Sequence, residues 1–201
     1  MEFIGSEKMA NLIVITGPQA VGKMTVAESL KEKINYKLMI NHDSIELAIR
    51  IFGNKNDAQK QLNEAIRTKA FEIAIKNNIN MIFTYVTAFD REDNINYLKT
   101  LQNMFEQTGG TFYLVELHAN LETRIKRNLT PHRLEEKPSK RNIERSKKEI
   151  IESMEKHKLN TNEEEYFCDN HIKIDNTNLS PDEVSEIIID KYKLLSNKIK
   201  R

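Results

Sequence analysis

The sequence predicts an α/β protein built on a five-stranded parallel sheet with helices on both faces. Three observations support this class. The chain has 201 residues, which suits one domain, and it contains five short apolar stretches separated by stretches with helical periodicity. Parallel neighbours in a sheet require a crossover, usually a helix, between successive strands. The alternation of the two signals therefore indicates a single three-layer domain.

The strand signals come first. The segment NLIVIT is continuously apolar and β-branched, which is typical of a strand buried on both faces. Four later segments, KLMI, NMIFTYV, TFYLVEL and HIKI, are short and apolar in the same way. The expected strands are residues 11–16, 37–40, 80–86, 111–117 and 171–174.

Helix signals fill the gaps between the strands. After the first strand Val26, Leu30 and Ile34 recur at intervals of four, and the last helix carries the start signal SPDE, with Ser180 as N-cap. In the third helix Asp57 is the expected N-cap, and Leu62, Ile66, Ile73 and Ile75 are the expected apolar residues. The remaining helices are expected from about 44 to 53, from 91 to 107, and from 121 onward.

Composition excludes several function classes. Basic and acidic residues balance at 31 to 30, and 39% of residues are hydrophobic, so neither global disorder nor overall nucleic-acid affinity is indicated. Cys168 is the only cysteine, no apolar run approaches a membrane span, and the start lacks signal-peptide features. We expect a cytoplasmic protein without a membrane partner. Residues 1–8 are interpreted as a leader or a cloning remnant, and 9–201 as one domain.

The segment ITGPQAVGKMT carries the sharpest motif. Gly17 and Gly22 stand where a backbone must turn its N–H groups inward, and Lys23 can reach terminal phosphates. The strand before the segment and the helix after it are the context that a phosphate-binding loop requires. A tight glycine turn between core elements would explain the glycines but not the lysine.

The form G-x-x-x-x-G-K-x-T, with the hydroxyl at Thr25, is similar to that of adenylate-kinase-like enzymes within the P-loop kinases, a group that includes shikimate kinase, gluconate kinase and chloramphenicol phosphotransferase. The resemblance implies the P-loop NTPase fold, ATP and Mg²⁺ as cofactors, and a catalytic Lys23. Because Met24 cannot ligate magnesium, the ion would be held through water and nucleotide oxygens, without a protein ligand. The implied nucleotide-binding residues are Gly17, Ala20, Val21, Gly22, Lys23, Met24, Thr25, Arg124 and Asn176.

An acceptor site is expected beyond the second strand. Asp43 follows that strand at the carboxyl edge, where it could orient or deprotonate an acceptor hydroxyl, or merely cap the next helix. Asn41 and His42 are weaker candidates. Residues that could line an acceptor pocket, or only pack, are Arg50, Thr84, Tyr85 and Thr87.

The third strand lacks the pattern of nucleotide kinases. Those enzymes follow this strand with an Asp-Gly and a Pro-Arg pair, whereas this chain reads FTYVTAFDRED. Asp90, with Arg91, is the nearest match, and it could act as a Walker B carboxylate or as a helix N-cap. This departure argues against a nucleoside monophosphate acceptor.

A basic stretch interrupts the alternation. Residues 124–148 hold ten Lys or Arg against three Glu, and we interpret about 127–142 as a lid inserted after the fourth strand. Arg124 and Arg127 would stand at its base, with Arg127 and Arg133 catalytic; the other closing charges would be Lys137, Lys140 and Arg141. The alternatives are a solvated helical face and a polyanion-binding surface. The absence of aromatic residues between 124 and 158 makes nucleic acid unlikely as a partner.

The sequence thus predicts ATP-dependent phosphoryl transfer to a small hydroxyl-bearing acceptor, in a P-loop NTPase three-layer α/β/α fold with a five-stranded parallel sheet and a basic lid insertion. In these kinases Asn176 and Thr177 would contact adenine, although a polar turn would explain them equally. An NTPase or nucleotide sensor without an acceptor, and a nucleic-acid end kinase, remain alternatives. The acceptor, the nucleotide base and the oligomeric state stay open.

Overall fold

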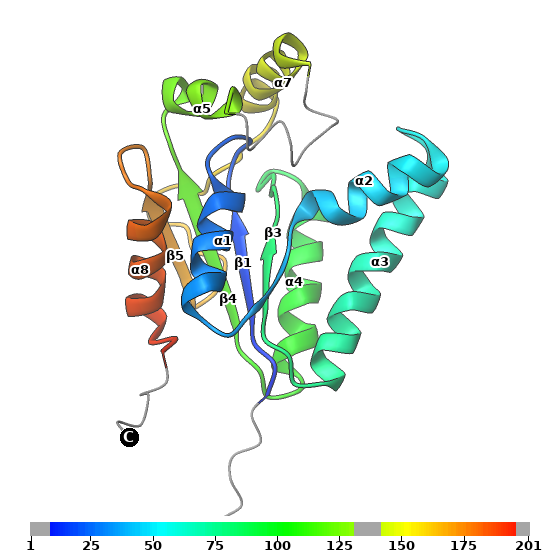
Figure 1. Ribbon diagram of the computed structural model, residues 1–201, viewed down its shortest axis with the longest axis vertical. Helices are drawn as coiled ribbons and strands as arrows, with labels where there is room; N and C mark the ends of the chain where they lie inside the picture. Colours follow the sequence, from blue (N-terminus) through cyan, green and yellow to red (C-terminus); the bar gives the residue numbers. More distant parts are fainter. Residues whose placement is uncertain (1–8, 131–141, 196–201) are drawn as a thin grey trace, which may run out of the picture.

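The five expected strands form one parallel sheet. The computed structural model describes residues 9–130 and 142–195 and is shown in Figure 1. The strands are β1 (Leu12–Thr16), β2 (Lys37–Met39), β3 (Met81–Thr84), β4 (Phe112–His118) and β5 (His171–Asp175). Their order in the sheet is β2-β3-β1-β4-β5, with every pairing parallel. The predicted fold class is therefore confirmed, with β1 at the centre.

Helices connect the strands as expected. They are α1 (Lys23–Lys33), α2 (Asn41–Phe52), α3 (Asp57–Lys76), α4 (Glu92–Glu106), α5 (Leu121–Asn128), α7 (Ile143–Lys156) and α8 (Pro181–Tyr192). The start of α8 follows the predicted capping box: Ser180 accepts from the Glu183 amide, and Glu183 accepts from the Ser180 amide. Two other starts differ from expectation. α2 begins at Asn41 rather than near Ser44, and α3 takes its N-cap from Asn56, whose side chain accepts from the Gln59 amide.

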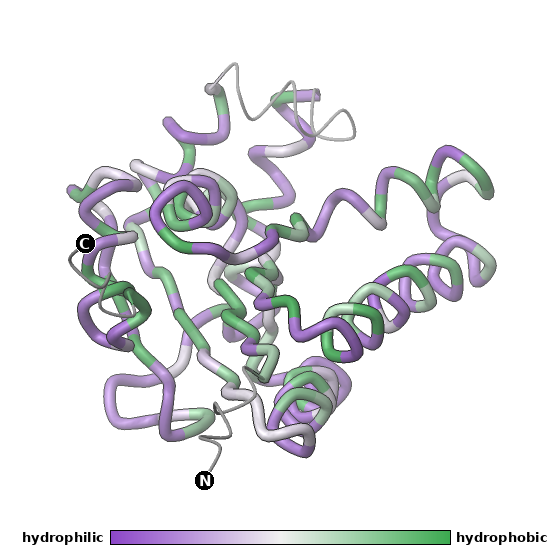
Figure 2. The backbone as a smooth tube through the Cα atoms, turned by 60° about the horizontal axis from the view of Figure 1, so that its bottom comes forward, coloured by the Kyte–Doolittle hydropathy of each residue, from purple (hydrophilic) through white to green (hydrophobic). Residues whose placement is uncertain are grey.

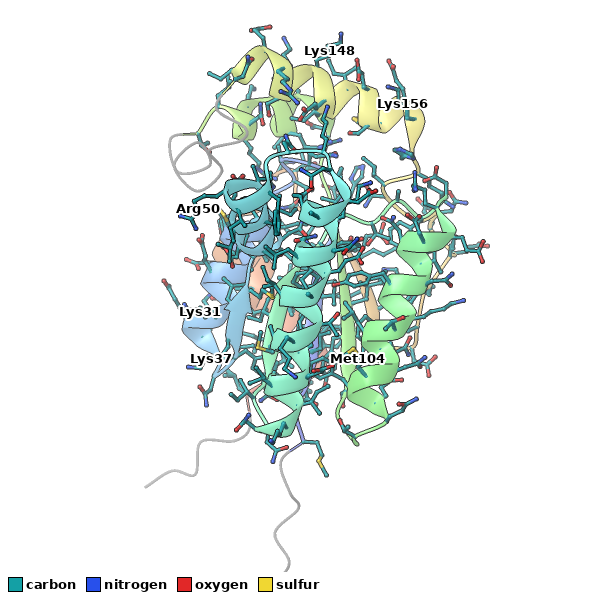
Figure 3. All side chains as sticks on the ribbon, turned by 90° about the vertical axis from the view of Figure 1, so that its right-hand side faces the viewer. Lys31, Lys37, Arg50, Met104, Lys148 and Lys156 are labelled. Atoms are coloured by element: carbon teal, nitrogen blue, oxygen red, sulfur yellow. The ribbon has the colours of Figure 1, made fainter. Side chains whose placement is uncertain are left out.

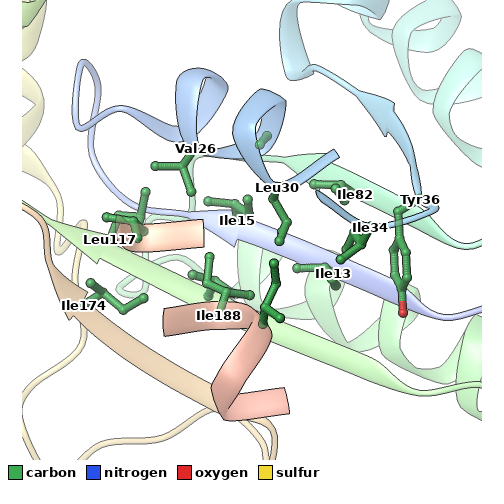
Figure 4. Packing of buried hydrophobic residues seen from close by; sticks show 14 of the residues in the cluster. Ile13, Ile15, Val26, Leu30, Ile34, Tyr36, Ile82, Leu117, Ile174 and Ile188 are labelled. Atoms are coloured by element: carbon green, nitrogen blue, oxygen red, sulfur yellow. The ribbon is translucent and has the colours of Figure 1, made fainter. Parts of the chain in front are cut away.

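Two apolar clusters pack on opposite faces of the sheet. On one face α1 and α8 cover Ile13 and Ile15 of β1, and Figure 4 shows Leu30 and Ile188 packed between helix and strand. On the other face α3 and α4 cover the alternate residues of the same strands, including Val14 of β1. Because β1 is buried on both faces, its loop at the carboxyl end is held on a rigid base.

Helices α2 and the first turns of α3 project from the body of the domain as an arm, which we call the α2–α3 arm. The two helices pack along one another, and Figure 2 shows them extending away from the apolar strands. Leu47, Ile51 and Phe52 of α2 are exposed there. Among the described residues, no helix combines the length and the apolar character needed to cross a membrane.

Helix α7 carries the described part of the basic stretch beyond α5. Its charges form i,i+4 pairs, Arg145 with Glu149 and both Lys148 and Lys156 with Glu152. In Figure 3 the labelled Lys148 and Lys156 point outward from this helix. This part of the stretch is a solvated, charge-paired helical face. The centre of the expected lid, residues 131–141, lies outside the described residues.

Candidate functional site: a phosphate loop at the end of β1

The loop between β1 and α1 needs its two glycines for different reasons. Gly17 has φ +132°, and a Cβ there would lie 2.3 Å from the carbonyl oxygen of Leu117 in β4. Only glycine lets the backbone pass this close to the neighbouring strand. Gly22 has φ +107° and is the N-cap of α1. Ala20 also has a positive φ, 59°, so the loop is tightly turned along its length.

Lys23 closes the loop. Its ammonium donates to the carbonyl oxygens of Gly17 and Pro18, both at 2.7 Å, so the side chain folds back over the backbone that encircles it. Thr25 donates through its hydroxyl to the Gly22 carbonyl oxygen at 2.9 Å. The first turn of α1 carries no acidic residue, and its N–H groups and dipole favour an anion.

Met24 is the second residue of α1, and it is buried, with 6% exposed. Val21 is fully buried, and its carbonyl oxygen serves as the anchor for two neighbouring side chains. The predicted phosphate-contacting residues thus divide into backbone donors of the loop, one cation and two packing side chains.

Arg127 and Asn176 brace the loop from the side of β5. Arg127 donates to the carbonyl oxygens of Val21 and Asn176, each at 2.8 Å, and the Asn176 side chain donates to Val21 at 2.9 Å. Burial lowers the pKa of the Arg127 guanidinium, and the charge of Asp175 opposes this shift. Next to it Thr177 accepts from the Asn120 amide at 3.1 Å.

Arg124 supports the other limb of the loop. Its Nε donates to the Gln19 carbonyl oxygen at 2.8 Å, and the side chain is only 2% exposed. Gln19 is further held by Ser153 of α7, whose hydroxyl donates to the Gln19 side chain at 2.8 Å. The two arginines expected at the base of a lid therefore hold the phosphate loop's own carbonyl groups.

Asp43 lies in the first turn of α2, at the carboxyl edge of the sheet as predicted. Its carboxylate accepts from the Ile40 amide at 2.8 Å, and its own amide donates to the Ile40 carbonyl oxygen at 3.0 Å. These two hydrogen bonds are those expected if Asp43 caps the helix, and the residue is exposed to solvent. In the neighbouring residue His42, Nδ1 lies 3.4 Å from Oε1 of Glu46 in the same helix.

The other predicted acceptor residues divide into two groups. Thr84 is buried and accepts from the Asn41 amide at 2.9 Å, which joins the end of β3 to the start of α2. Thr87 is buried against β1, where its hydroxyl bonds that of Thr16 at 2.8 Å. Tyr85 is half-buried beside them, whereas Arg50 is exposed on α2 (Figure 3).

Asp90 is bound to the segment that follows α7. One carboxylate oxygen accepts from the Lys158 amide at 2.9 Å, and the other is 3.2 Å from Nδ1 of His157. Burial alone would raise the pKa of Asp90, but these contacts lower it overall. Asp90 thereby joins the segment after α7 to the loop before α4, and its Walker B interpretation stays a prediction. Arg91 is the N-cap residue of α4.

Two features of the site were missed by sequence reasoning. Arg67 of α3 is buried and reaches Asn41 and Ser44 at the start of α2. Glu116 of β4 is buried, lies 3.0 Å from Nε2 of His171 on β5, and accepts from Thr161. A signal for Arg67 was available, since it stands four residues before Phe71 on the buried face of α3.

The arrangement can hold a polyphosphate. A cation, a helix N-terminus and inward backbone groups converge at the end of a central strand, as phosphate binding requires. Within residues 9–130 and 142–195, no cluster of three or more His, Cys, Asp or Glu could hold a metal ion. The remaining lid residues expected to act on phosphate, Arg133, Lys137, Lys140 and Arg141, lie outside the described residues.

Comparison with known proteins agrees with this geometry. No protein-family model and no curated protein matches the chain. Solved structures do match it: a sugar kinase from Janibacter sp. (13% identity, TM-score 0.58, covering 92% of this chain and 95% of that chain), a gluconokinase from Sinorhizobium meliloti (11%, 0.55, 92% and 93%) and the APS kinase of Mycobacterium tuberculosis (12%, 0.56, 92% and 98%).

The loop between β1 and α1 and the parallel sheet therefore place this chain in the class of P-loop folds. Within that class, the matched structures show that this chain has the fold of the P-loop kinases along almost its whole length. The resemblance inferred from the phosphate-loop motif is confirmed at the level of the fold.

Proposed function

We propose that this protein transfers the γ-phosphoryl group of ATP to a hydroxyl group of a small acceptor. The observation that carries the proposal is the ammonium of Lys23, held 2.7 Å from the carbonyl oxygens of Gly17 and Pro18 at the N-terminus of α1. The ammonium of a lysine in a phosphate loop can stabilise the negative charge of a phosphoryl group while that group is being transferred. The kinase structures that share the fold support the same reaction class.

The roles follow from the contacts. Loop amides and Lys23 would hold the β- and γ-phosphates, and Arg124 and Arg127 would keep the loop in shape from its two sides. The acceptor oxygen would attack the γ-phosphorus as its bond to the β–γ bridging oxygen breaks; the hydroxyl proton would pass to Asp43 and ADP would leave. Mg²⁺ would arrive with ATP, held by phosphate oxygens and water.

The first test compares Lys23→Ala with a matched variant of the same helix. Lys31→Ala removes an exposed lysine of α1 that points away from the domain (Figure 3). Magnesium-dependent ADP release is measured with pools of sugars, hydroxy acids, nucleosides and antibiotics that bear hydroxyl groups. We expect one pool to stimulate release by the wild type and by Lys31→Ala, and Lys23→Ala to lose at least about a hundredfold.

Folding is checked by circular dichroism and thermal melting of each variant. Turnover by a folded Lys23→Ala protein at the wild-type rate would refute the assignment of the phosphate loop. Lys23→Arg provides a second variant that keeps the charge but not the reach of the ammonium, and it should also lose most of the rate.

A nucleotide hydrolase or sensor without an acceptor is the second candidate. It is favoured by the observation that the carboxylate of Asp43 accepts the Ile40 amide, since this bond explains Asp43 without any acceptor. Asp43→Asn separates the two cases, because asparagine retains an oxygen for the cap but has no charge. Under the kinase proposal, acceptor-stimulated ADP release falls at least about tenfold while ATP affinity is kept. An unchanged ADP release that no acceptor pool stimulates would favour the hydrolase or sensor.

A further inference from the structure

Met154 of α7 is an exposed methionine in contact with a buried cation. Its side chain is 43% exposed, and its sulfur accepts a hydrogen bond from Nη1 of Arg124, with 2.9 Å between the two atoms. Thioether sulfur is a weak acceptor and a soft, oxidisable atom. A chemical change at this sulfur would therefore act directly on the guanidinium of Arg124.

The other methionines that the structure describes lie in different surroundings. Met24, Met39 and Met81 are buried, and Met104 packs against the core on the α3 and α4 face of the sheet. Met9 is 37% exposed and precedes β1, so it lies at the opposite end of that strand from the phosphate loop. Met9 thus provides an internal comparison of similar exposure.

Arg124 connects the sulfur of Met154 to the phosphate loop. Its Nε donates to the Gln19 carbonyl oxygen at 2.8 Å, and because the guanidinium is a rigid plane, Nη1 and Nε move together. Ser153, the residue before Met154, donates to the Gln19 side chain at 2.8 Å. Figure 1 shows α5 and α7 beyond the carboxyl end of β1, where the loop lies. Two neighbouring residues of α7 therefore hold Gln19, one directly and one through Arg124.

A cavity gives small molecules access to this contact. Met154, Arg124 and Pro18 of the phosphate loop all line one cavity of about 200 Å³. Since a water molecule takes up about 30 Å³ in the liquid, the cavity has room for hydrogen peroxide, which is only slightly larger.

The oxidation balances with hydrogen peroxide alone. A lone pair of the sulfur attacks one peroxide oxygen, an S–O bond forms as the O–O bond breaks, and the departing hydroxide takes the proton of the transferred oxygen to leave as water. The sulfur is oxidised to the sulfoxide by two electrons, and the peroxide is reduced by the same two. Methionine sulfoxide reductases reverse the change.

The sulfoxide does not fit the contact with Arg124. Nη1 and the sulfur are only 2.9 Å apart, so an oxygen between them would push the guanidinium away. An oxygen on the other lone pair would leave a positively polarised sulfur facing the cation, and the two would repel. Either epimer of the sulfoxide therefore displaces Arg124 from the Gln19 carbonyl oxygen.

We propose that Met154 is a modification site: hydrogen peroxide or an organic hydroperoxide converts it reversibly into the sulfoxide, and this loosens the phosphate loop through Arg124. The consequence for nucleotide binding rests on the kinase activity proposed above. The modification and its effect on the loop do not.

The first experiment follows the modification and the loop in the same samples of wild-type protein. Graded hydrogen peroxide is added, peptide mass spectrometry measures the oxidation of each methionine, and hydrogen–deuterium exchange measures the amides of residues 17–22. We expect Met154 and Met9 to oxidise before the buried methionines. The loop amides should exchange at least about threefold faster once Met154 is oxidised. Methionine sulfoxide reductases for both epimers, with a dithiol, should restore the original exchange rate.

Two variants separate Met154 from other effects of peroxide. Leucine has nearly the volume of methionine and is not oxidised, so peroxide should leave loop exchange in Met154→Leu at its starting rate, although Met9 is oxidised there. Met9→Leu should respond as the wild type does. Circular dichroism checks that both variants are folded.

Three results would overturn the proposal. The first is loop exchange that is the same in oxidised and reduced wild type. The second is an equal acceleration in peroxide-treated Met154→Leu. The third is Met154 remaining reduced at peroxide doses that oxidise Met9.

Nucleotide binding separates this inference from the proposed function. A non-hydrolysable ATP analogue with Mg²⁺ should bind at least about fivefold more weakly to the oxidised wild type, as expected for the loss of one hydrogen bond that shapes the loop. If loop exchange responds to Met154 oxidation but the analogue binds neither form, the kinase proposal fails and the modification site stands. If the reduced protein phosphorylates an acceptor but loop exchange ignores the oxidation, the kinase proposal stands and the modification site fails.

Discussion

Replacing Gly17 by alanine tests the packing that shapes the phosphate loop. The new Cβ would lie 2.3 Å from the Leu117 carbonyl oxygen, and both atoms belong to backbone, so one of them must move. The residue also has φ +132°, which an L side chain rarely adopts. Backbone strain of about 1–3 kcal/mol and overpacking of about 1–3 kcal/mol give a loss of roughly 2–6 kcal/mol in the free energy of unfolding.

Gly53→Ala provides the matched control. This residue also has a positive φ, +77°, but the nearest atom to its added Cβ is 3.9 Å away, so only backbone strain remains. With about 2–4 °C per kcal/mol for a chain of this size, Gly17→Ala should melt about 4–24 °C below the wild type. The fall for Gly53→Ala should be about half as large, about 2–12 °C, because only the backbone strain of about 1–3 kcal/mol applies. Melting followed by circular dichroism measures both, and equal falls for the two variants would refute the close approach of the loop to β4.

Two further predictions concern buried titratable groups. Burial alone would raise the pKa of Glu116, but hydrogen bonds from His171, Asn160 and Thr161 outweigh burial and lower it. The ionised carboxylate therefore stabilises the fold above its ordinary pKa of 4.5. That stabilisation is lost as the pH falls through the lower pKa of the folded state. Glu116→Gln should therefore lower the free energy of unfolding at pH 7, and it should weaken the fall of that free energy at acid pH, as measured by denaturant unfolding at a series of pH values. An unchanged fall at acid pH would contradict the hydrogen bonds assigned to Glu116. Burial raises the pKa of the Cys168 thiol to about 11 from 9.0, so native alkylation at pH 8 should be about a hundredfold slower than in denaturant. Comparable rates in the two states would show that the thiol is not shielded.

The strands were readable because their signal is local. A strand buried on both faces, such as β1, must be apolar at every position, and the sequence shows that directly. The glycine spacing is equally local, which explains why the loop between β1 and α1 was located correctly, whereas its phosphate-binding role stays a prediction. The order of the strands depends on contacts between distant segments and could not be derived from the sequence.

Side-chain assignments in α3 were less successful. Ile73 was expected in the apolar stripe but is 50% exposed, whereas Arg67 lies on the buried face with Phe71. Ile66 and Ile75 of the expected stripe do pack against the core, together with Phe71 and Ala74. The same side of the helix also carries Arg67, which joins Asn41 and Ser44. The start of α2 was misplaced for a similar reason, since it is set by the contact of Asp43 with Ile40 rather than by a Ser44 cap.

The side chains that hold the phosphate loop, Arg124, Arg127 and Asn176, matter for protein engineering. Backbone carbonyl groups of Gln19 and Val21 are held by arginines of α5, and Val21 is also held by Asn176 after β5. Because these side chains bind backbone carbonyl groups of the loop, the identity of the loop's own side chains determines little of its shape. Moving residues 17–25 alone into a related scaffold would leave out the arginine and asparagine side chains that hold the loop. The transferable unit is discontinuous: the loop, α5 and the turn after β5 would have to be moved together.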